Sequence, residues 1–353
     1  MEAGLIPPAL ALAAAVLFGL SAPAAKGLVG TVDPWLLAGL LYLASGVGLL
    51  AVWLAQRASG RSAREAGLAM PDLPWLLGAI IAGGVIGPVL LMAGLARGAA
   101  SEAALLLNLE GVMTALIAWT IVREHVHART VIGMAAISLG ALALAWGPRA
   151  GVALEWSSLL VGGACLAWAI DNNFTRAVSA ADPVQIAALK GIVAGSVNAG
   201  IALAQGAAWP PPAALLGAAI VGLLGYGISL VLFVIALRHL GTSRTGAYFS
   251  TAPFIGAVAA IVGLGEPVTL PLAIAAALMA LGVWLHLTER HDHEHTHETL
   301  GHEHAHHHDE HHEHDHPPGT VVTAPHTHWH VHAPLRHRHP HYPDLHHRHD
   351  HEA

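Results

Sequence analysis

The end of the chain carries an unusual density of metal-binding side chains. Of the 28 histidines in 353 residues, 24 follow residue 290, and the run that starts HDHEHTH at His291 has imidazole at every second position. Neutral imidazole binds zinc, nickel, cobalt and copper, and interleaved carboxylates add charge for a divalent cation. We expect the tail to bind one of these metals. The expected ligands are His291, His293, His295, His297, His302, His304, His306, His307, His308, His311, His312, His314 and His316.

The tail has few apolar residues to bury, and Pro317-Pro318-Gly319 interrupts it, so residues 289–353 are predicted to be largely disordered. A second register, HTHWHVHAPLRHRHPHYPDLHHRHDH, follows Pro325 and is more defined than a random tract. Three roles stay open. The tail could buffer or sense metal, respond to protons because imidazole titrates near about pH 6.5, or only add solubility.

A second set of polar residues interrupts apolar stretches. Ionisable side chains inside membrane spans cost several kcal/mol and usually mark a transport pathway. Asn172 and Arg176 are four residues apart, hence on one helix face, with Asp171 beside them. These residues predict a central cavity in which a carboxylate takes up and releases a proton. The set comprises Glu110, Asn108, Lys190, Asp171, Asn172, Asn173, Arg176 and Lys26. The alternative is structural: Arg176 reaches the interface and the asparagines join helices.

The elements that position these residues are predicted to be transmembrane helices. The chain is 54% hydrophobic and 11% charged, whereas soluble domains have roughly a quarter charged residues. Apolar runs long enough to cross a bilayer recur about ten times, which predicts an all-α integral membrane protein. The expected spans are 8–28, 35–55, 75–96, 103–122, 131–146, 159–178, 183–203, 215–237, 245–264 and 270–287.

Charges in the loops predict the orientation of these spans. With a cytoplasmic N-terminus, the inner loops collect most of the arginines, whereas the outer loops hold only Arg97 and Arg149. Both termini are then cytoplasmic and the expected location is the inner membrane. The single cysteine, Cys165, excludes a disulfide framework. The chain has no basic patch with interleaved aromatic residues, so nucleic-acid binding is not expected.

The chain also resembles itself at an offset of 142 residues. The segment that starts GLARGAASEAALLLN at Gly94 aligns without a gap to the one that starts ALRHLGTSRTGAYFS at Ala236, and Glu124 aligns with Glu266. A looser match places Asp33-Pro34 over Asp182-Pro183. Five spans in each copy is an odd number, so the copies must have opposite orientations, as in secondary transporters.

This duplicated pattern resembles the EamA branch of the drug/metabolite transporter superfamily over residues 5 to about 287. The resemblance implies two EamA-like five-helix repeats, residues 1–147 and 148–288, followed by the tail at 289–353. It also implies secondary transport of small organic solutes, commonly outward. Glu124 and Glu266 resemble the family's recurring helix-end glutamate, for which a structural role is the alternative. A departure is Glu110-Gly111, which stands where the second copy has Ala252-Pro253.

Several functions remain open at this point. The leading interpretation is an exporter of a small metabolite or drug-like solute, with a tail that senses or buffers metal. The alternative is an efflux transporter for nickel, cobalt or zinc whose tail delivers the ion, and a third is a membrane-anchored metal store. No nucleotide-binding motif and no nucleophile with a partnered base is found, so enzymatic chemistry and a nucleotide cofactor are not expected. The expected partners are lipid, a small-molecule substrate and metal ions, and a homodimer stays open.

Overall fold

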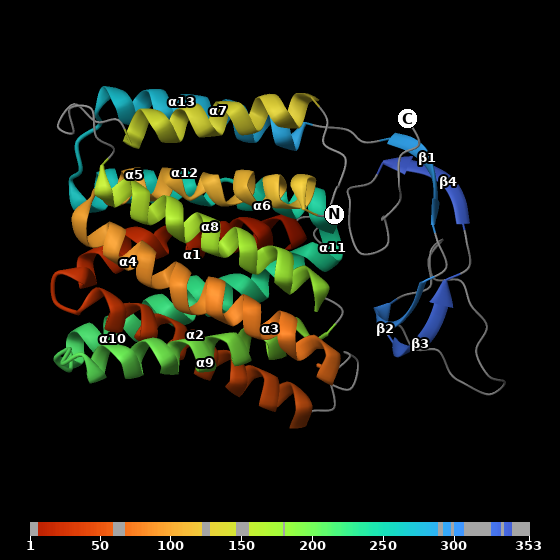
Figure 1. The fold of residues 1–353 in the computed structure, drawn as a ribbon, viewed down its shortest axis with the longest axis horizontal. Helices are drawn as coiled ribbons and strands as arrows, with labels where there is room; N and C mark the ends of the chain where they lie inside the picture. The colour runs from red at the N-terminus through yellow and green to blue at the C-terminus, as the bar shows by residue number, and fades with distance from the viewer. Residues whose placement is uncertain are drawn as a thin grey trace.

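The computed structural model describes residues 6–58, 68–121, 128–145, 155–178, 181–288, 292–297, 300–306, 326–332 and 335–340. The first half contains α1 (Ile6–Val29), α2 (Pro34–Ala58), η2 (Met70–Asp72), α3 (Leu73–Ala79), η3 (Ile80–Ile86), α4 (Gly87–Arg97), α5 (Ala100–Leu106), α6 (Asn108–Thr120) and α7 (Ala128–Ala145). The second half contains α8 (Trp156–Ala177), α9 (Pro183–Ala204), α10 (Pro212–Val221), η4 (Gly222–Ile228), α11 (Ser229–Phe249), α12 (Ala252–Leu264) and α13 (Leu270–Leu287). The helices lie side by side in one bundle (Figure 1).

The bundle has the length and composition of a membrane domain. Among the described residues, eight helical segments are long and apolar enough to cross a bilayer. The two remaining expected spans correspond to α8, which carries Asp171 and its polar neighbours, and to α12 with the end of α11. Large apolar side chains such as Leu216 and Val262 are exposed on the outside of the helices, where lipid would cover them. The prediction of an all-α integral membrane protein is confirmed.

The two halves share an irregularity at equivalent positions. The π-helical turns η3 and η4 start at Ile80 and Gly222, and 222 − 80 = 142. The helices that follow start at Gly87 and Ser229, which are also 142 apart. The offset found in the sequence therefore recurs in the backbone geometry, in agreement with two related five-helix repeats.

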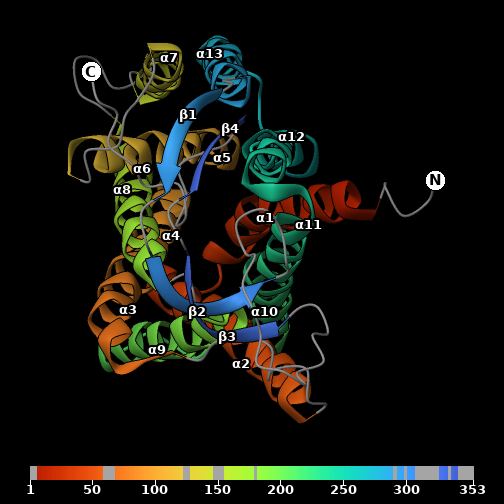
Figure 2. The same ribbon diagram turned by 90° about the vertical axis from the view of Figure 1, so that its right-hand side faces the viewer.

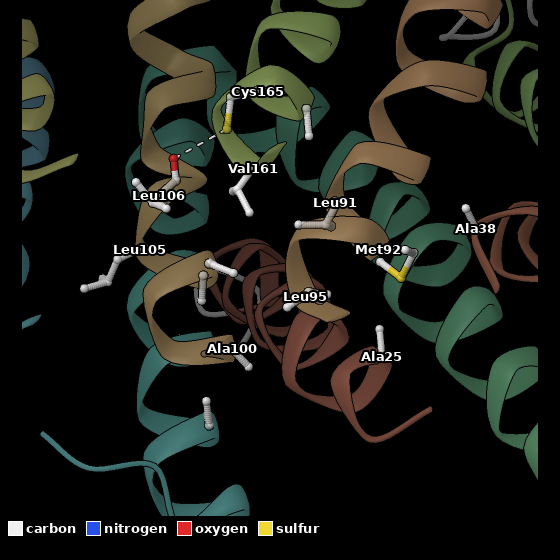
Figure 3. Packing of buried hydrophobic residues seen from close by; sticks show 14 of the residues in the cluster. Ala25, Ala38, Leu91, Met92, Leu95, Ala100, Leu105, Leu106, Val161 and Cys165 are labelled. Carbon is white, nitrogen blue, oxygen red and sulfur yellow. Dashed lines mark hydrogen bonds between the residues drawn. The ribbon is translucent and has the colours of Figure 1, made fainter. Parts of the chain in front are cut away.

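The fourth span is broken at Leu107, between α5 and α6. Cys165 of α8 donates to the carbonyl oxygen of Leu106 at 3.4 Å, next to this break, and apolar side chains surround the contact (Figure 3). The ninth span is broken one to two residues beyond the corresponding place, at Ser250 and Thr251, before α12. Both breaks place the start of a new helix within the apolar part of the bundle, and turn carbonyl oxygens accept from N–H groups of the new helix: Leu107 from Glu110 and Thr251 from Phe254, both at 3.1 Å.

Helix caps repeat as well. Asp33 accepts hydrogen bonds from the backbone N–H groups of Trp35 and Leu36 at the start of α2, at 2.9 and 3.0 Å. Asp182 accepts from Val184 and Gln185 at the start of α9, at 2.9 and 3.3 Å. The two Asp-Pro pairs aligned in the sequence thus both cap helices, because the carboxylate satisfies N–H groups that the first turn leaves free.

Small residues bring helix pairs into close contact at both ends of the bundle. Seen end-on, the pair α7 and α13 lies at one end and the pair α2 and α9 at the other (Figure 2). A Cβ added at Gly191 of α9 would lie 2.6 Å from Cα of Gly46 in α2, and one added at Gly282 of α13 would lie 2.6 Å from the carbonyl oxygen of Gly133 in α7. Such backbone approach is how helices associate where lipid supplies no hydrophobic drive.

In the tail, the described residues form strands where the sequence predicted disorder. β1 (Asp292–His297) pairs with β4 (Leu335–Pro340), and β2 (Leu300–His306) pairs with β3 (His326–His332), both antiparallel. The alternation of histidine with other residues has a period of two, which is the period of a strand. Composition indicated disorder, whereas this alternation favours extended pairing.

Replacing Gly191 by leucine should destabilise the bundle, because the side chain would overlap the backbone of Gly46 and force α2 and α9 apart. Overpacking of this kind costs about 1–3 kcal/mol, which lowers the unfolding temperature of the purified protein in detergent. Gly200→Leu is the matched control on the same helix, since nothing lies within 4 Å of a Cβ added there. Equal unfolding temperatures for the two variants would contradict this account of the packing.

Candidate functional site

An ion pair joins α8 to α9 inside the bundle. Lys190 Nζ donates to Asp171 Oδ1 at 2.5 Å and to Asp171 Oδ2 at 2.7 Å, and the Thr175 hydroxyl donates to Asp171 Oδ1 at 2.8 Å. The side chains of Lys190 and Asp171 are 17% and 9% exposed. Charges removed from water in this way need a partner, because the apolar surroundings neither solvate nor screen them. Each charge is therefore held by the other.

The turn η3 provides the surface against which Asp171 lies. A Cβ added at Gly83 would overlap the Asp171 carboxylate, so the absence of a side chain there makes room for the ion pair. The carbonyl oxygen of Gly83 accepts from Tyr42 Oη at 3.0 Å and from Trp168 Nε1 at 2.9 Å, and that of Gly84 accepts from Asn198 Nδ2 at 3.2 Å. Side chains of α2, α8 and α9 thus fix the π-helical turn, whose backbone departs from the regular helical hydrogen-bond pattern.

A second polar contact lies one residue along α8. Asn172 Nδ2 donates to Glu110 Oε1 at 2.9 Å and to the Thr114 hydroxyl at 3.3 Å, which joins α8 to α6. Asn172 is exposed and Glu110 is half-buried. Asn173 donates to the carbonyl oxygen of Ala169 at 2.8 Å, within its own helix. Two neighbouring residues of α8 therefore each take part in a polar contact that involves a carboxylate: Asp171 is ion-paired to Lys190, and Asn172 is hydrogen-bonded to Glu110.

Lys26 lies away from the Asp171–Lys190 pair and binds backbone carbonyl oxygens instead. Its Nζ donates to the carbonyl oxygens of Leu95 and Gly98, at 2.5 and 2.7 Å, at the end of α4. Glu266 accepts from the N–H groups of Ala100 and Ser101, at 2.7 and 2.8 Å, at the start of α5. A cation on the last carbonyls of one helix and a carboxylate on the first N–H groups of the next both match the helix dipoles. Together they hold the turn between α4 and α5.

The remaining predicted residues divide into two groups. Asn108 is buried and bonds to the carbonyl oxygen of Leu105 at 2.9 Å, next to the break in the fourth span. Arg176 lies in α8, and Glu124 is outside the described residues. His293, His295 and His297 fall in β1, and His302, His304 and His306 in β2. Outside the described residues are His291, His307, His308, His311, His312, His314 and His316.

The structure thus brings Asp171, Lys190, Asn172 and Glu110 to adjoining positions, and it places Lys26 away from them. Sequence reasoning missed Tyr42 and the π-helical turn at Gly83. The consecutive glycines at positions 83 and 84 were the available signal, because glycine inside an apolar span often marks close approach of another group. Among the helices that the structure describes, no three His, Cys, Asp or Glu residues group as metal ligands would.

Replacing Glu266 by alanine should destabilise the protein, because two N–H groups at the start of α5 lose their charged acceptor. Each unsatisfied buried donor costs about 1–3 kcal/mol, so the unfolding temperature in detergent falls. Glu266→Gln is the matched variant: it keeps one acceptor oxygen and should recover part of the loss. An alanine variant as stable as the original protein would show that the Glu266 contact does not stabilise the fold.

The comparisons with known proteins agree with this architecture. The EamA-like transporter family model matches twice, at residues 6–146 and 155–288. An uncharacterized transporter of Methanothermobacter thermautotrophicus is 27% identical over 287 residues, which cover 78% of this chain and 84% of the relative. A protein of known crystal structure is 20% identical, with a TM-score of 0.58 over 79% of this chain and 95% of its own, and so shares the fold. Because the family model covers most of the residues, the chain belongs to the EamA-like transporter family.

Proposed function

We propose that the protein is a secondary active transporter that exports a small organic solute across the inner membrane. Membership of a transporter family supports transport in general. The observation that carries the finer proposal is the buried Asp171–Lys190 pair, because paired charges inside a membrane bundle are costly and mark transport or proton pathways. We further propose that both termini are cytoplasmic, as the distribution of arginines in the loops indicates.

This orientation relates the two polar clusters to the two sides of the membrane. The connection between α8 and α9 is then cytoplasmic, and Asp171 lies six residues, about 9 Å, from the end of α8. The turn held by Lys26 and Glu266 is then on the outer side. A solute would reach the charged pair from the cytoplasm while the outer turn is closed, which is the state that an exporter needs for loading.

The ion pair suggests how ion movement could be coupled to the solute. A proton taken up by Asp171 removes its charge and releases the ammonium group of Lys190. Lys190 can then bind an anionic or polar group of the solute, and Glu110 with Asn172 offers a second titratable position nearby. Release of the solute restores the pair and returns the proton. Uptake and release of the proton and of the solute are thus linked through the same two side chains.

The Asp171–Lys190 pair also bears on whether a metal ion could be the transported substrate. Asp171 is the carboxylate that a divalent ion would use, but the ammonium group of Lys190 lies 2.5 Å from it and repels cations. An organic solute fits this charge arrangement better than a metal ion does. We therefore assign transition metal to the cytoplasmic tail, where it is sensed or buffered, and the solute to the bundle.

Asp171→Asn should abolish export, because the variant can neither pair with Lys190 nor exchange a proton. Cells that express the intact chain are compared with cells that express the variant, by mass spectrometry of solutes in the medium and elemental analysis of the cells. We expect at least one organic solute to accumulate outside with the intact chain and to fall about tenfold or more with Asp171→Asn. Lys190→Met should act in the same direction.

Asp33→Asn is the control, since asparagine caps helices as well as aspartate does and Asp33 lies at the start of α2, outside the charged pair. Its export should equal that of the intact chain. Loss of a transition metal from the cells that depends on Asp171, without export of an organic solute, would make metal the cargo and overturn the proposal. Export that is unaffected by Asp171→Asn would exclude the pair from the mechanism.

A further inference from the structure

Histidine stands opposite histidine along both ladders of the tail. In the β2–β3 ladder the paired positions are His302 with His330, His304 with His328, and His306 with His326. In the β1–β4 ladder they are His293 with His339 and His295 with His337. The three histidines of β3 named here come from the second register of the tail, which the sequence did not assign as ligands. The backbone pairing therefore joins two histidine-rich segments.

The pairing also sorts residue types by face. Alternate residues of a strand lie on one face of a ladder, so every cross-strand histidine pair of the β2–β3 ladder lies on the same face. The positions between them pair Glu303 with Trp329 and Ala305 with Thr327. In the β1–β4 ladder the position between the histidine pairs joins Glu294 to Arg338, which are opposite charges. Opposite charges placed across from each other favour this register. The register that pairs the histidines on one face therefore also pairs opposite charges on the other.

This arrangement has the spacing of a metal site. Residues directly opposite in an antiparallel pair have Cβ atoms about 4.5–5.5 Å apart, within reach of one ion that binds imidazole nitrogen at about 2.0–2.1 Å. Two neighbouring pairs supply four imidazoles, the number that tetrahedral zinc takes. Protonated imidazoles would instead repel one another across the strands. A bound divalent ion would turn this repulsion into a link between the strands.

We propose that the cross-strand histidine pairs of β2 and β3 form one binding site for a divalent transition metal of the zinc class. The proposal rests on the metal-binding tail of the proposed function and locates its ligands. It transfers the site from a continuous tract at 291–316 to two segments, 302–306 and 326–330, that lie opposite each other. Metal binding would therefore link segments 302–306 and 326–330 and give the tail a metal-dependent shape.

The test is zinc titration of the purified full-length protein in detergent against a chromogenic chelator. One variant replaces His302, His304 and His306 by asparagine, and a second replaces their partners His326, His328 and His330. A third combines both sets, and the matched control replaces His308, His311 and His312. Either ladder variant should weaken the tightest site about tenfold or more, because each removes half of the ligands. Because both sets of histidines belong to one site, the combined variant should bind zinc no more weakly than either ladder variant. The control variant should lose only weak sites.

The outcomes separate this proposal from the broader one. Loss in proportion to the number of histidines removed, equal for ladder and control variants, would overturn the paired site while leaving a metal-binding tail. No zinc bound by the full chain would overturn both. Because asparagine could itself weaken the strands, a second measurement keeps all ligands and adds none: nitroxide labels are attached through thioether bonds to Ala305→Cys and Thr327→Cys, which lie opposite each other between the histidine pairs. Zinc should narrow the distribution of distances between the two labels, measured by electron paramagnetic resonance, and a distribution unchanged by zinc counts against the site.

Discussion

The structure depends on one constraint: inside a membrane, every charge and every backbone polar group must find its partner within the protein. The Asp171–Lys190 pair meets this constraint for two charges at once. The carbonyl oxygen of Gly83, next to the pair, meets it by accepting from Tyr42 and Trp168. Polar residues are few in this bundle, and several of those described bond to a second helix, as Tyr42, Asn172 and Lys190 do. Such side chains connect neighbouring helices of the bundle.

The same constraint explains why small residues dominate the helix contacts. Where Gly46 meets Gly191 and Gly133 meets Gly282, backbones approach closely and dispersion contacts replace the missing hydrophobic drive. These close pairs form the two ends of the bundle, whereas the irregular helices with π-helical turns and breaks lie between them.

Much of the fold could be predicted from the sequence, because length, apolar runs and the 142-residue offset are local or periodic signals. The capping roles of Asp33 and Asp182 also follow from their position before proline and a helix. The contact between Lys26 and the end of α4 could not be predicted, since it joins residues about 70 positions apart through packing alone. The π-helical turns gave no periodic signal either, and only consecutive glycines hinted at one of them. In the tail, composition and alternation indicated opposite outcomes, and the described residues follow the alternation.

The two π-helical turns have a consequence for the history of the chain. A π-helical turn accommodates one more residue than regular α-helix does, so it records a single-residue insertion that the helix absorbed. Such insertions are rare, and here two lie at positions that differ by the repeat length itself. The simplest order of events places the insertion in a five-helix ancestor before its gene duplicated. The charged pair is present in one copy only: Gly83 faces Asp171 whereas its counterpart, Gly225, faces Ser21. The two copies thus share a backbone irregularity and differ in the charge that lies against it.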